Sequence, residues 1–169
     1  MANFHFFNLT PSVRSRMLKE LDHDIENSKL YISDRLTPMG KNNYADVFRN
    51  AIDGGDESTF TDSLRKYIKE TEIKQGKSRK VPTNAATLLA QSEFNRYYIR
   101  AVCLEALATG RNNVEVYRAR ESSRARPESE AKIGSNLNAD ALLADLRSST
   151  GSQPQILPEV NSGLSVKLD

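Results

Sequence analysis

Basic side chains gather in the middle of this sequence. Residues 74–126 hold 11 Lys and Arg against 4 Asp and Glu, whereas residues 1–73 and 127–169 carry net charges of −2 and −3. Such asymmetry indicates an anionic partner, because each Lys or Arg that meets a phosphate adds salt-dependent affinity. The residues that we expect to contact nucleic acid or an acidic protein are Lys74, Lys77, Arg79, Lys80, Arg118, Arg120, Arg124 and Arg126. A solvated loop and a charged strand edge are the plainer interpretation, since no helix-turn-helix, zinc-finger or RNA-recognition motif accompanies these residues.

Three further charged residues, Glu93, Arg96 and Arg100, recur at helical spacing. Along one side of a helix they could tie it to a loop of the same chain or to a neighbouring subunit, or they could face water. An enzyme would need a deep pocket that collects these groups and shifts their titration, and the spacing alone does not require one.

Signatures of catalysis are missing from the sequence. His5 and His23 fall in different predicted elements, and the acidic neighbours of His23 would point in different directions around a helix. The single cysteine, Cys103, lies between two aliphatic residues and is typical of a small core residue. No GxGxxG, GxxxxGK[ST], HExxH, GxSxG or CxxC motif occurs. We therefore predict a non-enzymatic protein with no catalytic, cofactor-binding or metal-ligating residue.

The C-terminal residues 151–169 are apolar in pattern but cannot form a continuous helix, because they include two prolines and two glycines. A solvated linker would rarely keep so many apolar side chains. We predict an extended arm that binds a partner through Ile156, Leu157, Val160, Leu164, Val166 and Leu168. The sequence leaves open whether this arm docks on its own domain or on another subunit. In the second case, removing residues 151–169 would leave a folded domain.

Apolar periodicity predicts the elements that position these residues. We expect helices over residues 11–27, 44–51, 58–73, 84–109 and 138–147, a turn at 37–40, a flexible loop at 74–80 and a strand at 114–120. That strand needs a partner, which could be residues 164–168, residues 30–32 or another subunit. The fold class is mainly α (α+β), with a compact helical domain around one long central helix at 1–148. A small β element and an extended arm at 149–169 complete the predicted architecture.

Composition sets the remaining limits. The chain has 169 residues, of which 38 % are hydrophobic and 27 % charged, and these values are typical of a soluble protein with one core. Its apolar runs are too short to span a membrane, and its N-terminus does not resemble a secretory signal. One cysteine fits a reducing compartment, so we expect synthesis in the cytoplasm and no membrane partner.

Three stretches of the sequence resemble a family of small, largely uncharacterised proteins encoded by bacteriophages and prophages. The stretches are SEFNRYYIRAVCLEAL, VEVYRARESSRARPESEAKIG and NSGLSVKL, so the resemblance covers roughly residues 81–168. It implies a phage origin and carries over no active-site residue. In build, though not in sequence, the predicted domain with its arm is similar to phage head and connector components.

The leading functional hypothesis is a phage structural or assembly protein: a minor capsid, decoration or head–tail joining component. Its partners would be capsid or portal-type subunits or further copies of itself, and it would be made in the host cytoplasm and end in the virion. The alternatives are a nucleic-acid-binding protein that uses residues 74–126 to contact DNA, and a phage-encoded modulator of a host protein.

Overall fold

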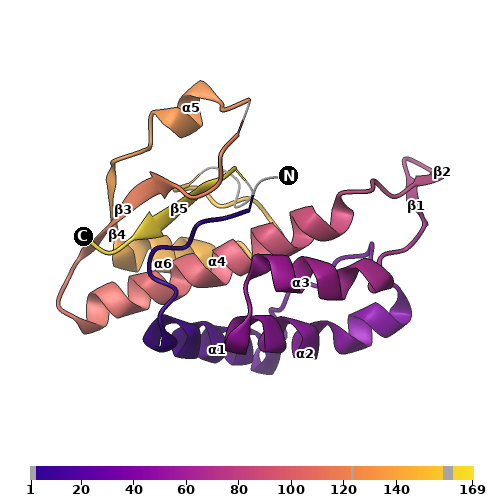
Figure 1. The fold of residues 1–169 in the computed structure, drawn as a ribbon, viewed down its shortest axis with the longest axis horizontal. Helices are drawn as coiled ribbons and strands as arrows, with labels where there is room; N and C mark the ends of the chain where they lie inside the picture. The colour runs from indigo at the N-terminus through magenta and orange to yellow at the C-terminus, as the bar shows by residue number, and fades with distance from the viewer. Residues whose placement is uncertain (1–2, 123, 158–161) are drawn as a thin grey trace.

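One long helix, α4 (Ala85–Ala108), is the axis of the computed structural model, which describes residues 3–122, 124–157 and 162–169 (Figure 1). Sixteen of its 24 residues are buried, because helices and strands cover it on several sides. The prediction of a mainly α (α+β) domain around a central helix is confirmed. Among the described residues, no helix combines the length and the apolar character needed to cross a membrane.

Three helices precede α4, and each begins at a residue whose side chain accepts a hydrogen bond from the first turn. The helices are α1 (Pro11–Glu26), α2 (Pro38–Gly54) and α3 (Glu57–Leu64), with the 3₁₀ turn η1 (Arg65–Tyr67) after α3. Thr37 is the N-cap of α2, so the predicted turn at 37–40 is wrong. Pro38 follows this cap at the first helical position, where its missing amide costs nothing.

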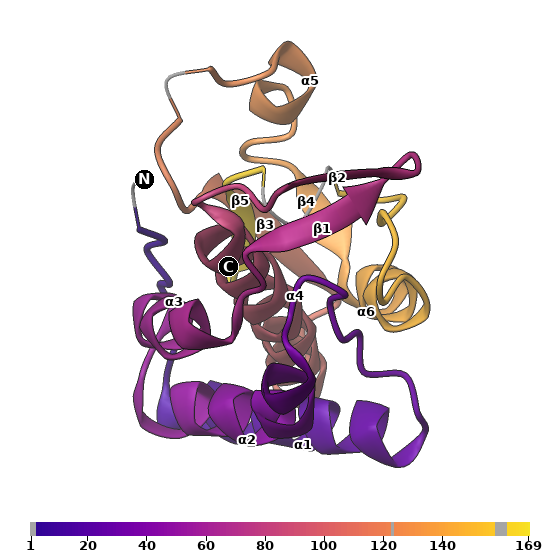
Figure 2. The same cartoon turned by 90° about the vertical axis from the view of Figure 1, so that its right-hand side faces the viewer.

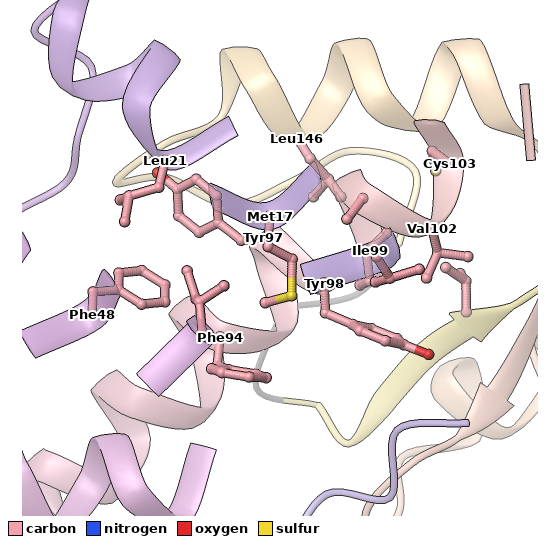
Figure 3. Packing of buried hydrophobic residues seen from close by; sticks show 14 of the residues in the cluster. Met17, Leu21, Phe48, Phe94, Tyr97, Tyr98, Ile99, Val102, Cys103 and Leu146 are labelled. Atoms are coloured by element: carbon pink, nitrogen blue, oxygen red, sulfur yellow. The ribbon is translucent and has the colours of Figure 1, made fainter. Parts of the chain in front are cut away.

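The core forms where α1, α3 and α6 pack around α4, while α2 packs on α1 and α3 and reaches α4 through the side chain of Phe48. Figure 3 shows Met17 and Leu21 of α1 and Phe48 of α2 gathered around the aromatic residues of α4, with Leu146 of α6 nearby. The rings of Phe48 and Tyr97 meet edge to face, with centroids 5.2 Å apart. This geometry is favourable for aromatic pairs and helps to hold α2 against α4.

A three-stranded antiparallel sheet packs on the side of α4 that faces away from α1 and α2 (Figure 1). Its central strand, β3 (Asn113–Arg118), lies between β4 (Asn136–Asn138) and β5 (Leu164–Lys167). The short helix α5 (Pro127–Glu130) and α6 (Ala139–Ser148) connect these strands. In the register, Val116 lies opposite Val166, so residues 164–167 of the C-terminal arm are one of the two strand partners of β3, both of which come from the same chain.

The six apolar arm residues therefore lie mostly within the domain rather than on a free segment. Leu157, Leu164 and Val166 are buried in the core, Ile156 and Leu168 pack against it half-buried, and Val160 falls outside the described residues. The side chain of Asn95 on α4 also donates to the carbonyl of Leu164, at 2.8 Å. The described residues of the predicted arm therefore dock on their own domain, which is the cis alternative, and do not extend away from it as a separate segment.

Residues 71–80 form a β-hairpin that the sequence patterns did not predict. Strand β1 (Thr71–Lys74) pairs antiparallel with β2 (Lys77–Lys80), so the helix expected to reach residue 73 ends instead at Leu64. The flexible loop expected at 74–80 is also wrong. Gln75 and Gly76 have φ values of 54° and 76°, and two positive φ values allow the tight turn that joins twisted strands.

Candidate functional site

A groove of about 660 Å³ lies beside the β1–β2 hairpin. Three segments that are distant in sequence supply its walls: residues 31–35, residues 68–79, and residues 85–93 in the first half of α4. Figure 2 looks toward this end of the molecule and shows the hairpin standing in front of the helices and the sheet. The hairpin residues Ile73, Lys74 and Arg79, which line the groove, are exposed to solvent.

The hairpin itself is exposed along nearly its whole length. Ile73 is 72 % exposed, and Lys74, Lys77 and Lys80 are exposed around it. Residues 65–80 hold seven Lys and Arg against two Glu, a net charge of +5. An exposed aliphatic residue within a basic hairpin has no role in the core, and this combination suits a contact with another molecule.

Glu72 anchors the hairpin to the body of the domain. Arg35 Nε donates to its carboxylate at 2.8 Å from one side, and Arg79 Nη2 donates at 2.7 Å from β2. The hydrogen bonds from Arg35 and Arg79 lower the pKa of Glu72 to about 2. Glu72 therefore stays charged at neutral pH and keeps both guanidinium groups in place along the groove.

One of the carboxyl groups that line the groove is buried. Glu93 is only 4 % exposed, and burial raises its pKa although Arg96 lies 3.5 Å away. The nearby hydroxyl of Tyr44 is buried without a hydrogen-bond partner among the described residues. Burial is the main cause that raises the pKa of Tyr44 well above its ordinary value, and the charge of Glu93 adds to it. Glu93 thus contributes a carboxyl group that is almost completely shielded from water, whereas Tyr44 lies behind the groove lining in the core.

Arg96 tethers α4 to the chain that follows α6. Its guanidinium donates to Ser149 Oγ at 3.1 Å and to the carbonyl of Ser152 at 3.3 Å. It is therefore engaged within the domain rather than directed into the groove.

Arg100 ties α4 to α1 in the same way. It pairs with Asp24 at 2.6 Å and with Glu20 at 2.8 Å, while Tyr97 donates its hydroxyl proton to Asp24 at 2.6 Å. Arg100 and Asp24 are both fully buried. The predicted polar stripe on α4 is therefore an intrachain tie, and a water-facing stripe is the wrong interpretation.

The predicted basic block divides into two separate groups. Lys74, Lys77, Arg79 and Lys80 lie on the hairpin at the right of Figure 1, whereas β3 and α5 lie at its upper left. The second group belongs to β3 and the segment before α5, and consists of Arg118, Arg120, Arg124 and Arg126.

The first two members of that second group have partners within the domain. Arg118 forms an ion pair with Glu130, and Arg120 donates to Gln91 Oε1 at 2.6 Å while lying over the ring of Phe4. The side chains of residues 124 and 126 are exposed beside α5. The eight basic residues do not form one continuous surface, because β3 and the hairpin lie at different ends of the fold.

The other sequence candidates lie away from the groove. Cys103 is fully buried, and burial raises the pKa of its thiol to about 12. The described residues contain no group of three or more His, Cys, Asp or Glu that could hold a metal ion.

The groove residues that sequence reasoning missed include Arg35, Lys69, Glu72, Ile73, Leu88 and Leu89. The alternation of TEIK before a Gln-Gly pair was the one local signal for this site, because it is typical of a hairpin strand.

The groove lining provides cations, apolar surface on the hairpin and α4, and one buried carboxyl group. These are the components of a binding surface, since apolar contact gives affinity and charge gives orientation. The chain matches no protein-family model, no curated protein and no solved structure.

Proposed function

We propose that this chain is a non-enzymatic assembly protein that binds a partner protein through the β1–β2 hairpin and the adjoining groove. The observation that supports this proposal is the exposure of the hairpin, on which Ile73 is 72 % exposed among basic residues. The resemblance to phage-encoded proteins suggests a virion as the assembly, with the chain as a minor capsid, decoration or head–tail joining component. The helical body would then be the scaffold that holds the hairpin, and the C-terminal arm would be part of that scaffold.

Charge reversal on the hairpin tests this function. Lys74→Glu with Lys77→Glu changes two exposed side chains at the hairpin tip and should leave the core intact. The matched control, Lys19→Glu with Arg124→Glu, changes the net charge equally at exposed sites outside the hairpin. In sucrose gradients of lysates from cells that produce the assembly, wild type and control should sediment with large particles, and the hairpin variant should stay at the top. Wild-type protein that sediments at its own 18.9 kDa would contradict the proposal.

Nucleic-acid binding is the second candidate, because a two-stranded ribbon is narrow enough to enter a DNA major groove. Contacts from Lys74, Lys77 and Lys80 to three phosphates would give a salt slope near −2.7, so affinity would fall ~40-fold between 50 and 200 mM salt. Fluorescence anisotropy with a 20-base-pair duplex measures this dependence. Binding that is absent or insensitive to salt would exclude this candidate.

A further inference from the structure

The groove begins where two extended segments of the chain separate. Residues 35–37 and 67–69 pair antiparallel, with Thr37 N–H donating to the carbonyl of Tyr67 at 2.7 Å and Lys69 N–H donating to that of Arg35 at 2.8 Å. Leu36 and Ile68 form the bridge between them. If this pairing continued, residues 31–34 would lie opposite residues 70–73. The two segments instead separate, and Tyr31, Ser33 and Asp34 from the first and Glu72 and Ile73 from the second line the groove.

This separation leaves one edge of β1 without a strand partner. Val81 N–H donates to the carbonyl of Glu70 at 2.9 Å, so Glu70 faces the β2 side of the hairpin. Backbone groups alternate along an antiparallel strand, and Thr71 and Ile73 must therefore face the opposite side, as Lys69 does. Within the described parts of the chain, no backbone hydrogen bond satisfies Thr71 or Ile73 on that edge. An unpaired edge of this kind is a template for an added strand.

The side chains around this edge specify the chemistry of an added strand. Four cations line the same groove and favour carboxylates on the partner. They are Arg35, Lys69, Lys74 and Arg79. Ile73 of β1 and the half-buried leucines of α4 offer apolar contacts between these cations. An extended peptide presents alternate residues to opposite sides, so a segment with alternating acidic and apolar residues matches both features.

We propose that the partner adds an extended acidic segment to the free edge of β1, within the groove between β1 and residues 31–34. This inference rests on the proposed function of the hairpin and specifies how the partner is held. The main-chain groups of Thr71 and Ile73 supply the hydrogen bonds, and the cations that line the groove select an acidic segment. A DNA duplex cannot continue the backbone pairing that Lys69 begins with Arg35, so nucleic acid is a separate outcome of the test.

Two proline substitutions distinguish the edges of the hairpin. Ile73→Pro removes an amide that faces the groove, whereas Ser78→Pro removes the amide of its cross-strand neighbour, which faces the opposite edge. Neither amide contributes to the β1–β2 ladder, and proline is tolerated at such edge positions. Ile73→Ala keeps the amide and isolates the contribution of the apolar side chain.

The probe is a fluorescein-labelled eight-residue peptide that alternates glutamate with valine, titrated against the full chain. Ile73→Pro should weaken binding at least tenfold, Ser78→Pro should change it less than twofold, and Ile73→Ala should have an intermediate effect. The amides of Thr71 and Ile73 in the wild type should also exchange with solvent more slowly when peptide is bound. Circular dichroism checks that each variant is folded.

Two results overturn the inference. If Ile73→Pro and Ser78→Pro bind the peptide equally, or if exchange at Thr71 and Ile73 is unchanged, the edge is not used. If charge reversal at Lys74 and Lys77 nevertheless abolishes peptide binding, the hairpin is still the binding surface. The proposed function then stands, and only strand addition is excluded. If the wild type ignores the peptide but binds duplex DNA with steep salt dependence, strand addition and the protein-assembly function both fail.

Discussion

Arg100 offers the sharpest test of how the domain is held together. Its side chain is completely buried and contacts two carboxylates of α1, with Nη1 2.6 Å from Asp24 and Nε 2.8 Å from Glu20. Its guanidinium also lies over the ring of Tyr97, 4.6 Å from the centroid. The substitution Arg100→Met keeps much of the aliphatic volume and removes the charge. It leaves Asp24 buried, with the Tyr97 hydroxyl as the remaining hydrogen-bond donor to its carboxylate among the described residues.

The expected cost is large because removing one partner of a buried ion pair leaves the other charge uncompensated. Such changes destabilise proteins by about 3–5 kcal/mol. Glu20 keeps a second partner, since Arg147 Nη2 lies 2.8 Å from its carboxylate, so most of the loss should come from Asp24. We expect Arg100→Met to lower the free energy of unfolding by ~4 kcal/mol. For a chain of this length, that corresponds to a fall in Tm of roughly 8–16 °C.

The loss should depend on pH. Burial alone would raise the pKa of Asp24, but hydrogen bonds from Arg100 and Tyr97 outweigh burial and hold the pKa below its ordinary value. In the wild type, the stability from this group is therefore present above the unfolded pKa and is lost as pH falls through the lowered folded pKa. Without Arg100, burial dominates and raises the pKa of Asp24. Protonation of Asp24 then removes the cost of burying its unpaired charge as pH falls through this raised pKa.

Urea unfolding followed by far-ultraviolet circular dichroism measures both effects. The difference in unfolding free energy between wild type and Arg100→Met should shrink by more than ~1.4 kcal/mol from pH 7 to pH 4, which corresponds to one pKa unit. Adding Asp24→Leu to Arg100→Met should restore at least ~1 kcal/mol at pH 7, because it removes the unpaired charge. If Arg100→Met lowers the free energy of unfolding by less than ~1.5 kcal/mol, and by the same amount at pH 7 and pH 4, the reasoning is refuted.

Three further predictions concern the core and the C-terminal strand. The thiol of Cys103 should resist Ellman's reagent at pH 8 until urea unfolds the protein, because its pKa is about 12 and it is buried; modification in the native state at the rate of a free thiol would contradict this. Gly163→Ala should destabilise the domain by about 2 kcal/mol or more in urea unfolding, since Gly163 has φ of 91° and a Cβ there would lie 2.8 Å from the carbonyl oxygen of Arg120. Its control, Gly54→Ala, meets no atom within 4 Å and should be neutral or slightly stabilising; equal losses in the two variants would count against the geometric argument. Deleting residues 164–169 should abolish cooperative thermal unfolding, because the core loses the buried side chains of Leu164 and Val166, each worth roughly 1.5–3 kcal/mol. A truncated chain that melts cooperatively near the wild-type Tm would show that β5 is dispensable.

Helices with local start signals could be predicted from sequence. Thr10 before a proline and an apolar stripe predicted α1, and the dense apolar residues after position 84 predicted α4 as the central helix. Asn138 caps α6, and Gly110 adopts a positive φ just after α4. These features depend on residues within a few positions of one another, so a local pattern contains the necessary information.

Pairing between distant segments could not be predicted in the same way. The alternation of residues 164–168 indicated an extended strand, but the same pattern would suit docking on this chain or on another. Burial of Glu93, Arg96 and Arg100 depends on α1 and on the chain beyond α6, which no spacing within α4 reveals. The groove likewise joins residues 31–35 to a hairpin about 40 positions later, so sequence patterns identified some of its cations but not its shape.

The hairpin's exposure has a structural cause that bears on its role. A two-stranded hairpin is marginally stable alone in water, so it needs support from the domain. Glu72 supplies that support through Arg35, and the pairing of residues 35–37 with 67–69 fixes the base of the strands. The domain thus holds the hairpin at its base while Ile73 and the free edge of β1 stay open to solvent. A fixed strand edge loses little conformational entropy when a partner binds, which makes it a better docking element than the flexible loop expected from sequence.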